Sequence, residues 1–248
     1  METTELAPKR GITETGLKWI ALVTMVLDHI HYFFGFTGVI PEWFSMAGRI
    51  SAPLFMFCLV EGFTHTHNRK KYFLKVYAIS AAMSLLYYLM AYGGLPVRPD
   101  GFFPANGMMT TFVILMVVWQ GIDWLGQKRL LPGLAAVLLP LAWPFAATLL
   151  VAVFPALSGL PGFVCYSVLP LWGMTGDSSW PVLVMGLVLY LFRKRRGVQV
   201  AAFTVYYLLY GVVYMGLMAS NLPGFVWTQL FTVYYEIYGV LAAPLMLW

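Results

Sequence analysis

The chain has 248 residues, of which 60% are hydrophobic and 10% charged, and its mean hydropathy is +0.77. A soluble domain carries roughly 25% charged residues, so this composition excludes an ordinary soluble enzyme, and its spread along the whole chain excludes a protein with a single membrane anchor. The 15 Lys and Arg against 10 Asp and Glu give a net charge of +5, but the basic residues form short clusters rather than a continuous stripe, which excludes a nucleic-acid-binding surface.

Apolar runs of about 20 residues predict transmembrane helices in the first half of the chain. They lie near residues 17–36, 44–63, 72–92 and 108–125. The first run has no cleavage site of small residues after it. We therefore expect it to stay in the protein as a true span and not to be removed as a signal peptide.

The second half of the chain is less regular. Residues 130–154 contain Pro132, Pro140 and Pro144 and predict one kinked span, because neighbouring groups can satisfy the carbonyls that proline frees. Residues 155–177 are rich in Gly and Pro and residues 180–192 are short, so either could be a re-entrant segment or a short helix. Two ordinary spans are expected at 198–219 and 225–248. The prediction is an all-α polytopic transmembrane helix bundle, a single integral membrane domain over 1–248, with about eight spans, or nine to ten if short helices between 155 and 192 are included.

Lys and Arg clusters predict the orientation, because such clusters mark cytoplasmic loops. They are Lys9, Arg10 and Lys18, then Arg69, Lys70, Lys71 and Lys75, then Lys128 and Arg129, and then residues 193–196. All of them lie on one side only if residues 155–177 do not cross the membrane. We therefore expect a multi-pass protein of an inner or plasma membrane with both termini in the cytoplasm.

Ionisable residues inside predicted spans are costly and are usually paired or functional. Those that stand out are Asp28, His29, Arg49 and Glu61. At a rise of about 1.5 Å per residue, Arg49 comes near the depth of Asp28, and Glu61 near that of Lys18. Two ion pairs between the first two spans are therefore expected, Asp28 with Arg49 and Lys18 with Glu61. Gln229 and Glu236 of the last span could line a cavity.

These charges allow more than one interpretation. Buried ion pairs can simply hold helices in register. A histidine beside a carboxylate can also act as an oriented general base or relay protons in a transporter. Residues 62–71 combine hydroxyl, imidazole, amide and cationic donors that suit phosphate groups, although they could equally be an ordinary cytoplasmic loop. No metal site is expected, since His65 and His67 do not face one another on a helix and the two cysteines have no metal-ligand spacing.

Three segments resemble the TraX family of membrane proteins in order and spacing. They are KWIALVTMVLDHI from Lys18, AGRISAPLFMF from Ala47, and EGFTHTHN from Glu61 with Lys71 and Tyr72 after it. The family is named for a conjugation protein that acetylates the amino terminus of pilin. The resemblance thus implies an integral-membrane acetyltransferase that takes acetyl-CoA from the cytoplasm. Lys18 and His29, with ten residues between them, are also similar to a first-helix motif of membrane acyltransferases that modify sugars, where the basic residue is usually Arg.

The resemblance implies roles for single residues. His29 would be the general base, Asp28 would orient it or pair with Arg49, and Arg49 could instead polarise the thioester or hold a phosphate. The residues expected to contact CoA are Lys18, Glu61, His65, Asn68, Arg69 and Lys70.

The implied partners are acetyl-CoA, membrane lipid and an acceptor amine or hydroxyl on a pilin-like N-terminus, another protein or an envelope glycan, with no nucleic acid. Two alternatives stay open. One is a proton-coupled small-molecule transporter that uses Asp28 and His29. The other is a structural subunit of an envelope complex, in which the intramembrane charges matter only for stability.

Overall fold

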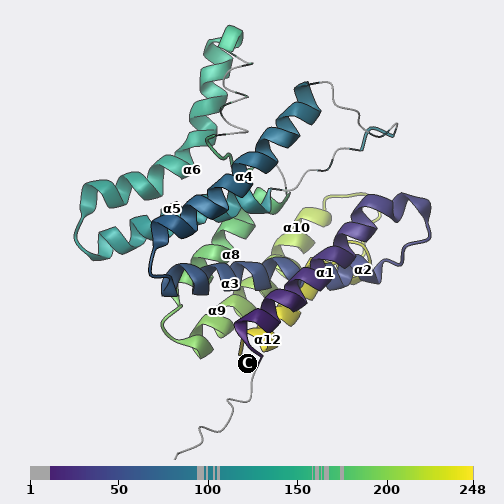
Figure 1. The fold of residues 1–248 in the computed structure, drawn as a ribbon. Helices are drawn as coiled ribbons and strands as arrows, with labels where there is room; N and C mark the ends of the chain where they lie inside the picture. The colour runs from purple at the N-terminus through teal and green to yellow at the C-terminus, as the bar shows by residue number, and fades with distance from the viewer. Residues whose placement is uncertain are drawn as a thin grey trace, which may run out of the picture. The chain divides into compact units, whose positions relative to one another are not determined.

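The computed structural model describes residues 12–93, 98, 100–102, 104, 107–157, 159, 162, 164, 168–173 and 176–247, and all regular structure in this part of the chain is helical (Figure 1). The α-helices are α1 (Glu14–Phe34), α2 (Trp43–Gly48), α3 (Ser51–His65), α4 (Arg69–Tyr92), α5 (Met108–Gly126), α6 (Leu130–Val153), α8 (Trp180–Leu191), α9 (Arg196–Leu208), α10 (Met215–Ala219), α11 (Gln229–Thr232) and α12 (Ala242–Leu247). The other helical elements are the π-helix η4 (Leu209–Tyr214) and the 3₁₀ helices η1 (Gly35–Thr37), η2 (Pro155–Leu157), η3 (Gly176–Ser178) and η5 (Glu236–Leu241).

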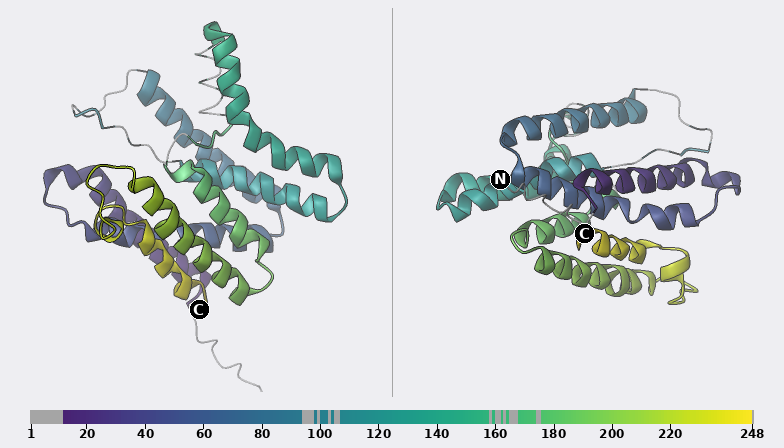
Figure 2. Two further views of the ribbon diagram at one scale, coloured as in Figure 1. Left: turned by 180° about the vertical axis from the view of Figure 1, so that it is seen from behind. Right: turned by 60° about the horizontal axis from the view of Figure 1, so that its bottom comes forward.

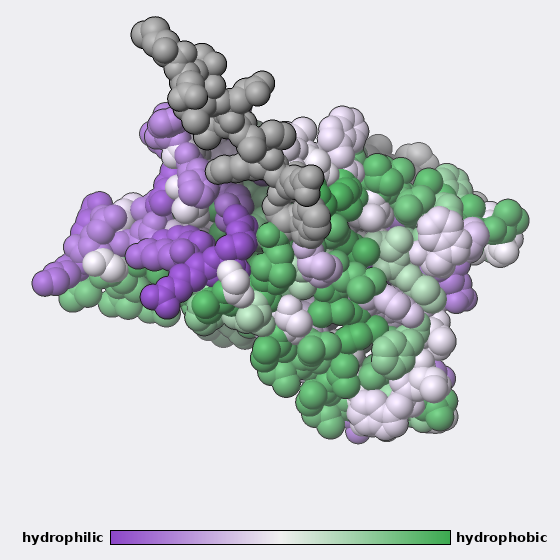
Figure 3. Space-filling view, turned by 90° about the horizontal axis from the view of Figure 1, so that it is seen from below, coloured by the Kyte–Doolittle hydropathy of each residue, from purple (hydrophilic) through white to green (hydrophobic). Residues whose placement is uncertain are grey.

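Among the described residues, six helical runs are long and apolar enough to cross a membrane: Glu14–Thr37, Trp43–His65, Arg69–Met90, Met108–Gly126, Leu130–Val153 and Arg196–Ala219. Two shorter apolar helices are Trp180–Leu191 and Glu236–Leu247. Large hydrophobic side chains are exposed along these elements, for instance Leu131 and Leu139 on α6, and Figure 3 shows how much of the visible surface is hydrophobic. The chain is therefore a polytopic all-α membrane protein, as predicted.

The chain forms two compact units. Unit 1 combines the residues up to Cys58 with those from Phe192 onwards, and unit 2 consists of Leu59–Leu191. Unit 1 thus joins the two ends of the chain, while unit 2 is one continuous stretch.

In unit 1, small side chains bring α1 and α2 close together. Ser45 and Gly48 lie one turn apart on α2 and are both buried. A Cβ atom at Gly48 would lie only 2.6 Å from Cγ of Asp28 on α1. The two helices consequently pack side by side and antiparallel, as Figure 2 shows.

The second half of unit 1 is an antiparallel pair of helical runs. One run is α9, η4 and α10, and the other is the C-terminal segment. Cβ atoms built at Gly211 and Gly216 would meet Ile237 and Trp227 respectively, so residue numbers rise along one run as they fall along the other.

The last expected span, 225–248, is not an ordinary helix. Helix α11 ends at Thr232, and the next helical element starts at Glu236. Tyr235 between them has φ +56°, a left-handed conformation that an α-helix cannot contain. The prediction of one continuous helix here is therefore wrong, and the segment is broken near its middle.

Unit 2 is built around α5. Residues 111–116 of this helix, together with Val118 and Trp119, are all buried. Helix α6 turns back along α5, and a Cβ at Gly121 of α5 would lie 2.9 Å from the carbonyl oxygen of Gly133 of α6. Glycines at the crossing thus let the two backbones touch.

Helix α6 contains Pro140 and Pro144 and bends sharply near its middle, as Figures 1 and 2 show. Trp172 donates a hydrogen bond from Nε1 to the carbonyl of Leu141, 3.0 Å away, and Thr148 donates to the carbonyl of Pro144. The bend lies at the two prolines, which confirms the predicted kinked span and gives its physical cause, and the two side chains add hydrogen bonds beside it.

Contacts within unit 2 show the direction of α8 along α5. Thr111, near the start of α5, donates to the carbonyl of Asp177 just before α8, and Trp119 further along α5 stacks on Tyr190 near the end of α8. Helix α8 thus runs parallel to α5, whereas α6 runs antiparallel to it.

Candidate functional site

His29 lies on α1, well inside the first span. Its Nδ1 is 2.8 Å from the carbonyl oxygen of Met25, one turn earlier. Because a carbonyl can only accept, a hydrogen bond here requires the proton on Nδ1, and in that tautomer the lone pair of the ring lies on Nε2. The rings of Tyr32 and Phe33 lie 6.5 and 6.2 Å from the His29 ring, centroid to centroid. The helix itself therefore orients His29 as a potential base.

The partner of Asp28 is neither Arg49 nor His29, the two that were expected. Its Oδ1 accepts a hydrogen bond from the Ser45 hydroxyl at 3.0 Å, and the backbone of Gly48 packs directly against its side chain. It neither pairs with Arg49 nor orients His29. Both of those predictions are wrong, because Asp28 points into the contact between α1 and α2, whereas His29 bonds within its own helix.

Arg49 instead pairs with Glu236, from the opposite end of the sequence. Nη1 of Arg49 lies 2.9 Å from Oε1 of Glu236, and the side chains are 32% and 22% exposed. Glu236 was identified from the sequence only as a residue that could line a cavity. Its position at the start of an apolar run was the available signal, but a partner 187 residues away could not be inferred from spacing.

The backbone is irregular both just before Glu236 and in the helical run that packs against η5. Tyr235 has the left-handed conformation described above, and its hydroxyl donates to Oε2 of Glu42 at 2.8 Å. Opposite, the π-helix η4 packs against η5, where a Cβ at Gly211 would lie 3.2 Å from Cα of Ile237. Both π-helical turns and left-handed non-glycine residues concentrate at functional sites.

Two other basic residues of unit 1, Lys18 and Arg196, lie at the end of the unit away from the ion pair of Arg49. Arg196 lies over the ring of Phe57. Phe57 is eight residues after Arg49, which corresponds to about 12 Å along a helix. Lys18 lies in the same direction along α1 and pairs with Glu14 at 2.5 Å. The single turn between Lys18 and Glu14 favours this local pair. Glu61 belongs to unit 2, so its expected pairing with Lys18 stays a prediction.

In unit 2, three of the residues expected to contact CoA lie at the start of α4, namely Asn68, Arg69 and Lys70. The Asn68 side chain caps the helix by accepting from the backbone N–H of Lys71 at 2.8 Å. Arg69 is already engaged, since it pairs with Asp123 at 2.7 Å, bonds Gln120 and lies over Phe63. Glu61 lies 3.7 Å from His65, whose side chain is 75% exposed. Arg69 therefore ties the start of α4 to the end of α5.

Lys70 and Lys71 differ from Arg69. Both are exposed, and within the part of the chain that the structure describes they take part in no ion pair. They extend from the first turn of a helix whose free N–H groups attract anions. This turn is the most cationic candidate for binding a phosphate in unit 2.

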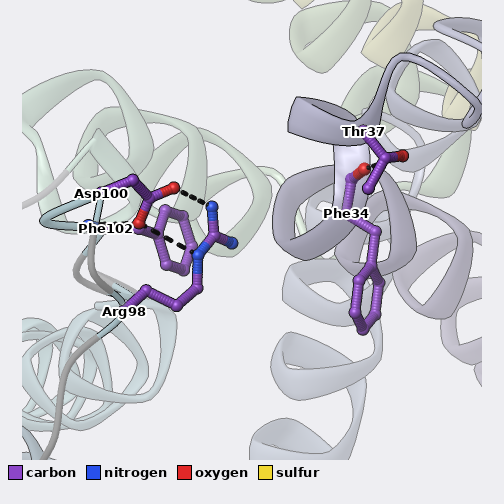
Figure 4. A network of polar contacts seen from close by, with 5 residues as sticks. All are labelled: Phe34, Thr37, Arg98, Asp100 and Phe102. Atoms are coloured by element: carbon purple, nitrogen blue, oxygen red, sulfur yellow. Dashed lines mark hydrogen bonds and ion pairs between the residues drawn. The ribbon is translucent and has the colours of Figure 1, made fainter.

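Two loops at helix ends are held by local hydrogen bonds, drawn in Figure 4. In unit 2, the Arg98 guanidinium bonds the Asp100 carboxylate and lies over the ring of Phe102. The hydrogen bond from Arg98 holds the pKa of Asp100 below its ordinary value of 3.8, so the pair is ionised at neutral pH. In unit 1, the Thr37 hydroxyl donates to the carbonyl of Phe34 after α1.

Residues 13–247 match the family described as TraX protein. No curated protein matches the chain, and no solved structure matches it. The match covers both units and nearly every described residue, so the chain belongs to the TraX family.

Proposed function

We propose that this protein is a membrane acetyltransferase that moves an acetyl group from acetyl-CoA to an amine or hydroxyl, with His29 as general base. The observation that carries the proposal is the Nδ1 contact of His29 with the Met25 carbonyl, which leaves Nε2 as the basic nitrogen at membrane depth. Membership of the TraX family supports the same reaction, since the family is named for an acetyltransferase.

The proton balance of the reaction suits a neutral histidine. Nε2 of His29 would take the proton of the acceptor as its nitrogen or oxygen bonds to the acetyl carbonyl carbon. The imidazolium would return that proton to the CoA thiolate as the carbon–sulfur bond breaks. The Met25 carbonyl would stabilise the imidazolium throughout, because it accepts from Nδ1–H.

The residues proposed to contact CoA differ in whether other side chains already pair with them. Lys70 and Lys71 offer unneutralised cationic donors to a phosphate. Lys18 is half exposed and only locally paired, so it stays in the proposed set, as do His65 and Asn68. Arg69 and Glu61 already have partners, and we assign Arg69 to positioning α4.

The test is transfer of radiolabelled acetyl groups from acetyl-CoA to a cell-envelope fraction by the purified protein in lipid vesicles. His29→Asn keeps a donor that can reach the Met25 carbonyl but removes the base, and His29→Gln places an amide at the Nε2 position. Both variants should bind acetyl-CoA as the wild type does and lose transfer by a factor of about 100 or more.

Full transfer by His29→Asn would contradict the role of His29. Absence of both binding and transfer in the wild type would contradict the enzyme altogether. In that case proton-coupled transport, measured as a flux lost in Asp28→Asn, becomes the leading function.

A further inference from the structure

The Arg49–Glu236 pair lies deep in unit 1. Asp28 is nine residues before Thr37, where the first span ends, which corresponds to about 13 Å. The hydrogen bond from Ser45 to Asp28 fixes α2 at this depth, and Arg49 follows α2 directly. The pair is thus far inside the thickness of a hydrocarbon core of about 30 Å.

Part of each side chain in this pair is accessible. Arg49 is 32% exposed and Glu236 is 22% exposed. An ion pair at this depth that faced lipid would carry a large desolvation cost. The accessible part of the pair therefore needs a polar environment.

The non-helical backbone next to the pair also requires a polar environment, independently of the charges. Residues Val233–Tyr235 form no helix, and Val233 is 55% exposed. Within a membrane, non-helical backbone is tolerated where it is buried in protein or lines a water-filled space, but not where it faces lipid. Because Val233 is exposed, burial in the protein does not account for the non-helical backbone at this point. The remaining condition is that this backbone lines a water-filled space.

The charges suggest from which end water comes. Glu42 lies at the end of unit 1 where α1 ends and α2 begins, and the Tyr235 hydroxyl bonds it. The opposite end carries Lys18 and Arg196. The Tyr235 hydroxyl thus bonds Glu42 at the end away from these basic residues, and the next residue along the chain, Glu236, pairs with Arg49.

We propose that water enters unit 1 from the Glu42 end and reaches the Arg49–Glu236 pair along the break at Val233–Tyr235. This is the entrance for a hydrophilic acceptor that arrives from water, and not from the lipid phase, on the side of the membrane opposite the basic end. The assignment of an acceptor rests on the proposed acetyltransferase function, whereas the entry of water does not.

The test is the reaction of single cysteines with a charged, membrane-impermeant methanethiosulfonate, in a background in which Cys58 and Cys165 are alanine. Val233→Cys and Glu236→Cys report on the entrance. Val213→Cys is the matched control, since Val213 is 48% exposed and lies on η4 two residues from Gly211, on the face turned away from η5. Thiols react as thiolates, which form in water and not in lipid.

We expect both entrance cysteines to react at least tenfold faster than Val213→Cys, and only when the reagent is added on the side opposite the basic end. Equal rates for Val233→Cys and Val213→Cys, or reaction only from the basic end, would overturn the proposal. Glu236→Cys removes the ion pair. If this variant does not fold, Val233→Cys still tests the proposal, because it leaves the pair intact.

A second arm tests the acceptor. Modified Val233→Cys should keep acetyl-CoA binding and lose transfer to the water-soluble part of the envelope fraction. Unchanged transfer would show that the acceptor takes another route. If the wild type transfers no acetyl group but the entrance cysteines still react selectively, the proposed function fails while the entry of water stands.

Discussion

Gly48 shows how one residue fixes the position of a charged neighbour. Its missing side chain lets Asp28 lie between α1 and α2, where Ser45 bonds it. We predict that Gly48→Ala lowers the free energy of unfolding by about 1–3 kcal/mol, because the added methyl group collides with the Asp28 carboxylate.

Gly197→Ala is the matched control. Nothing lies within 4 Å of a Cβ at that position, which is in the first turn of α9. Thermal unfolding in detergent should show a lower Tm for Gly48→Ala and an unchanged or slightly higher Tm for the control. Equal Tm values for the two variants would contradict the close contact.

The Arg49–Glu236 pair predicts energetic coupling between residues 187 positions apart. Arg49→Gln and Glu236→Gln should each destabilise the protein, because each leaves a charge without its partner at membrane depth. The double variant should lose less than the sum of the two, with a coupling of about 0.5–3 kcal/mol in a double-mutant cycle. Additive losses would show that the two side chains do not interact.

Among single side chains, the sequence identified which were unusual but not what they contact. Asp28, His29 and Arg49 stood out because charges are rare inside apolar runs. Their partners are Ser45, the Met25 carbonyl and Glu236. Counting depth along two helices could not choose Glu236, since it lies on a third segment whose packing depends on tertiary structure.

Helix α4 begins with three basic residues, which the helix dipole disfavours. The stability of its first turn therefore depends on the Asn68 cap. Asn68→Ala should cost about 0.5–2 kcal/mol, because the N–H of Lys71 loses its acceptor. Asn68→Asp keeps an acceptor and adds a favourable negative charge at the helix start, so it should be neutral or stabilising. A loss of stability in Asn68→Asp equal to that in Asn68→Ala would contradict the capping role; chemical unfolding in mixed micelles measures both.

Hydropathy predicted the long helices well, because about 20 apolar residues have few alternatives in a bilayer. It could not predict the break at Val233–Tyr235 or the π-helix at Leu209–Tyr214. Both segments are as apolar and aromatic as their neighbours. Gly211 in the π-helix packs against Ile237, two residues after the break, and composition carries no record of that contact.

Most basic residues described in each unit lie at one end of that unit, and Arg49 and Arg98 are exceptions. In unit 1 they include Lys18 and Arg196, and in unit 2 they include Arg69, Lys128 and Arg129 around the start of α4 and the turn between α5 and α6. Such ends are retained in the cytoplasm. We therefore expect green fluorescent protein fused after Leu247 to fluoresce, and alkaline phosphatase inserted at Gly38, in the loop before α2, to be active. The reverse pattern would contradict this orientation.

The measurement that tests the account most directly is a titration of the purified protein in detergent with acetyl-CoA and with CoA. The wild type and His29→Asn should bind saturably and equally, and Lys70→Ala with Lys71→Ala should bind more weakly, because unpaired cations at the start of α4 are proposed to contact phosphate. Lys128→Ala, which removes an exposed cation outside the proposed set, is the control and should bind as the wild type does. Absence of saturable binding to the wild type would contradict the acetyltransferase proposal.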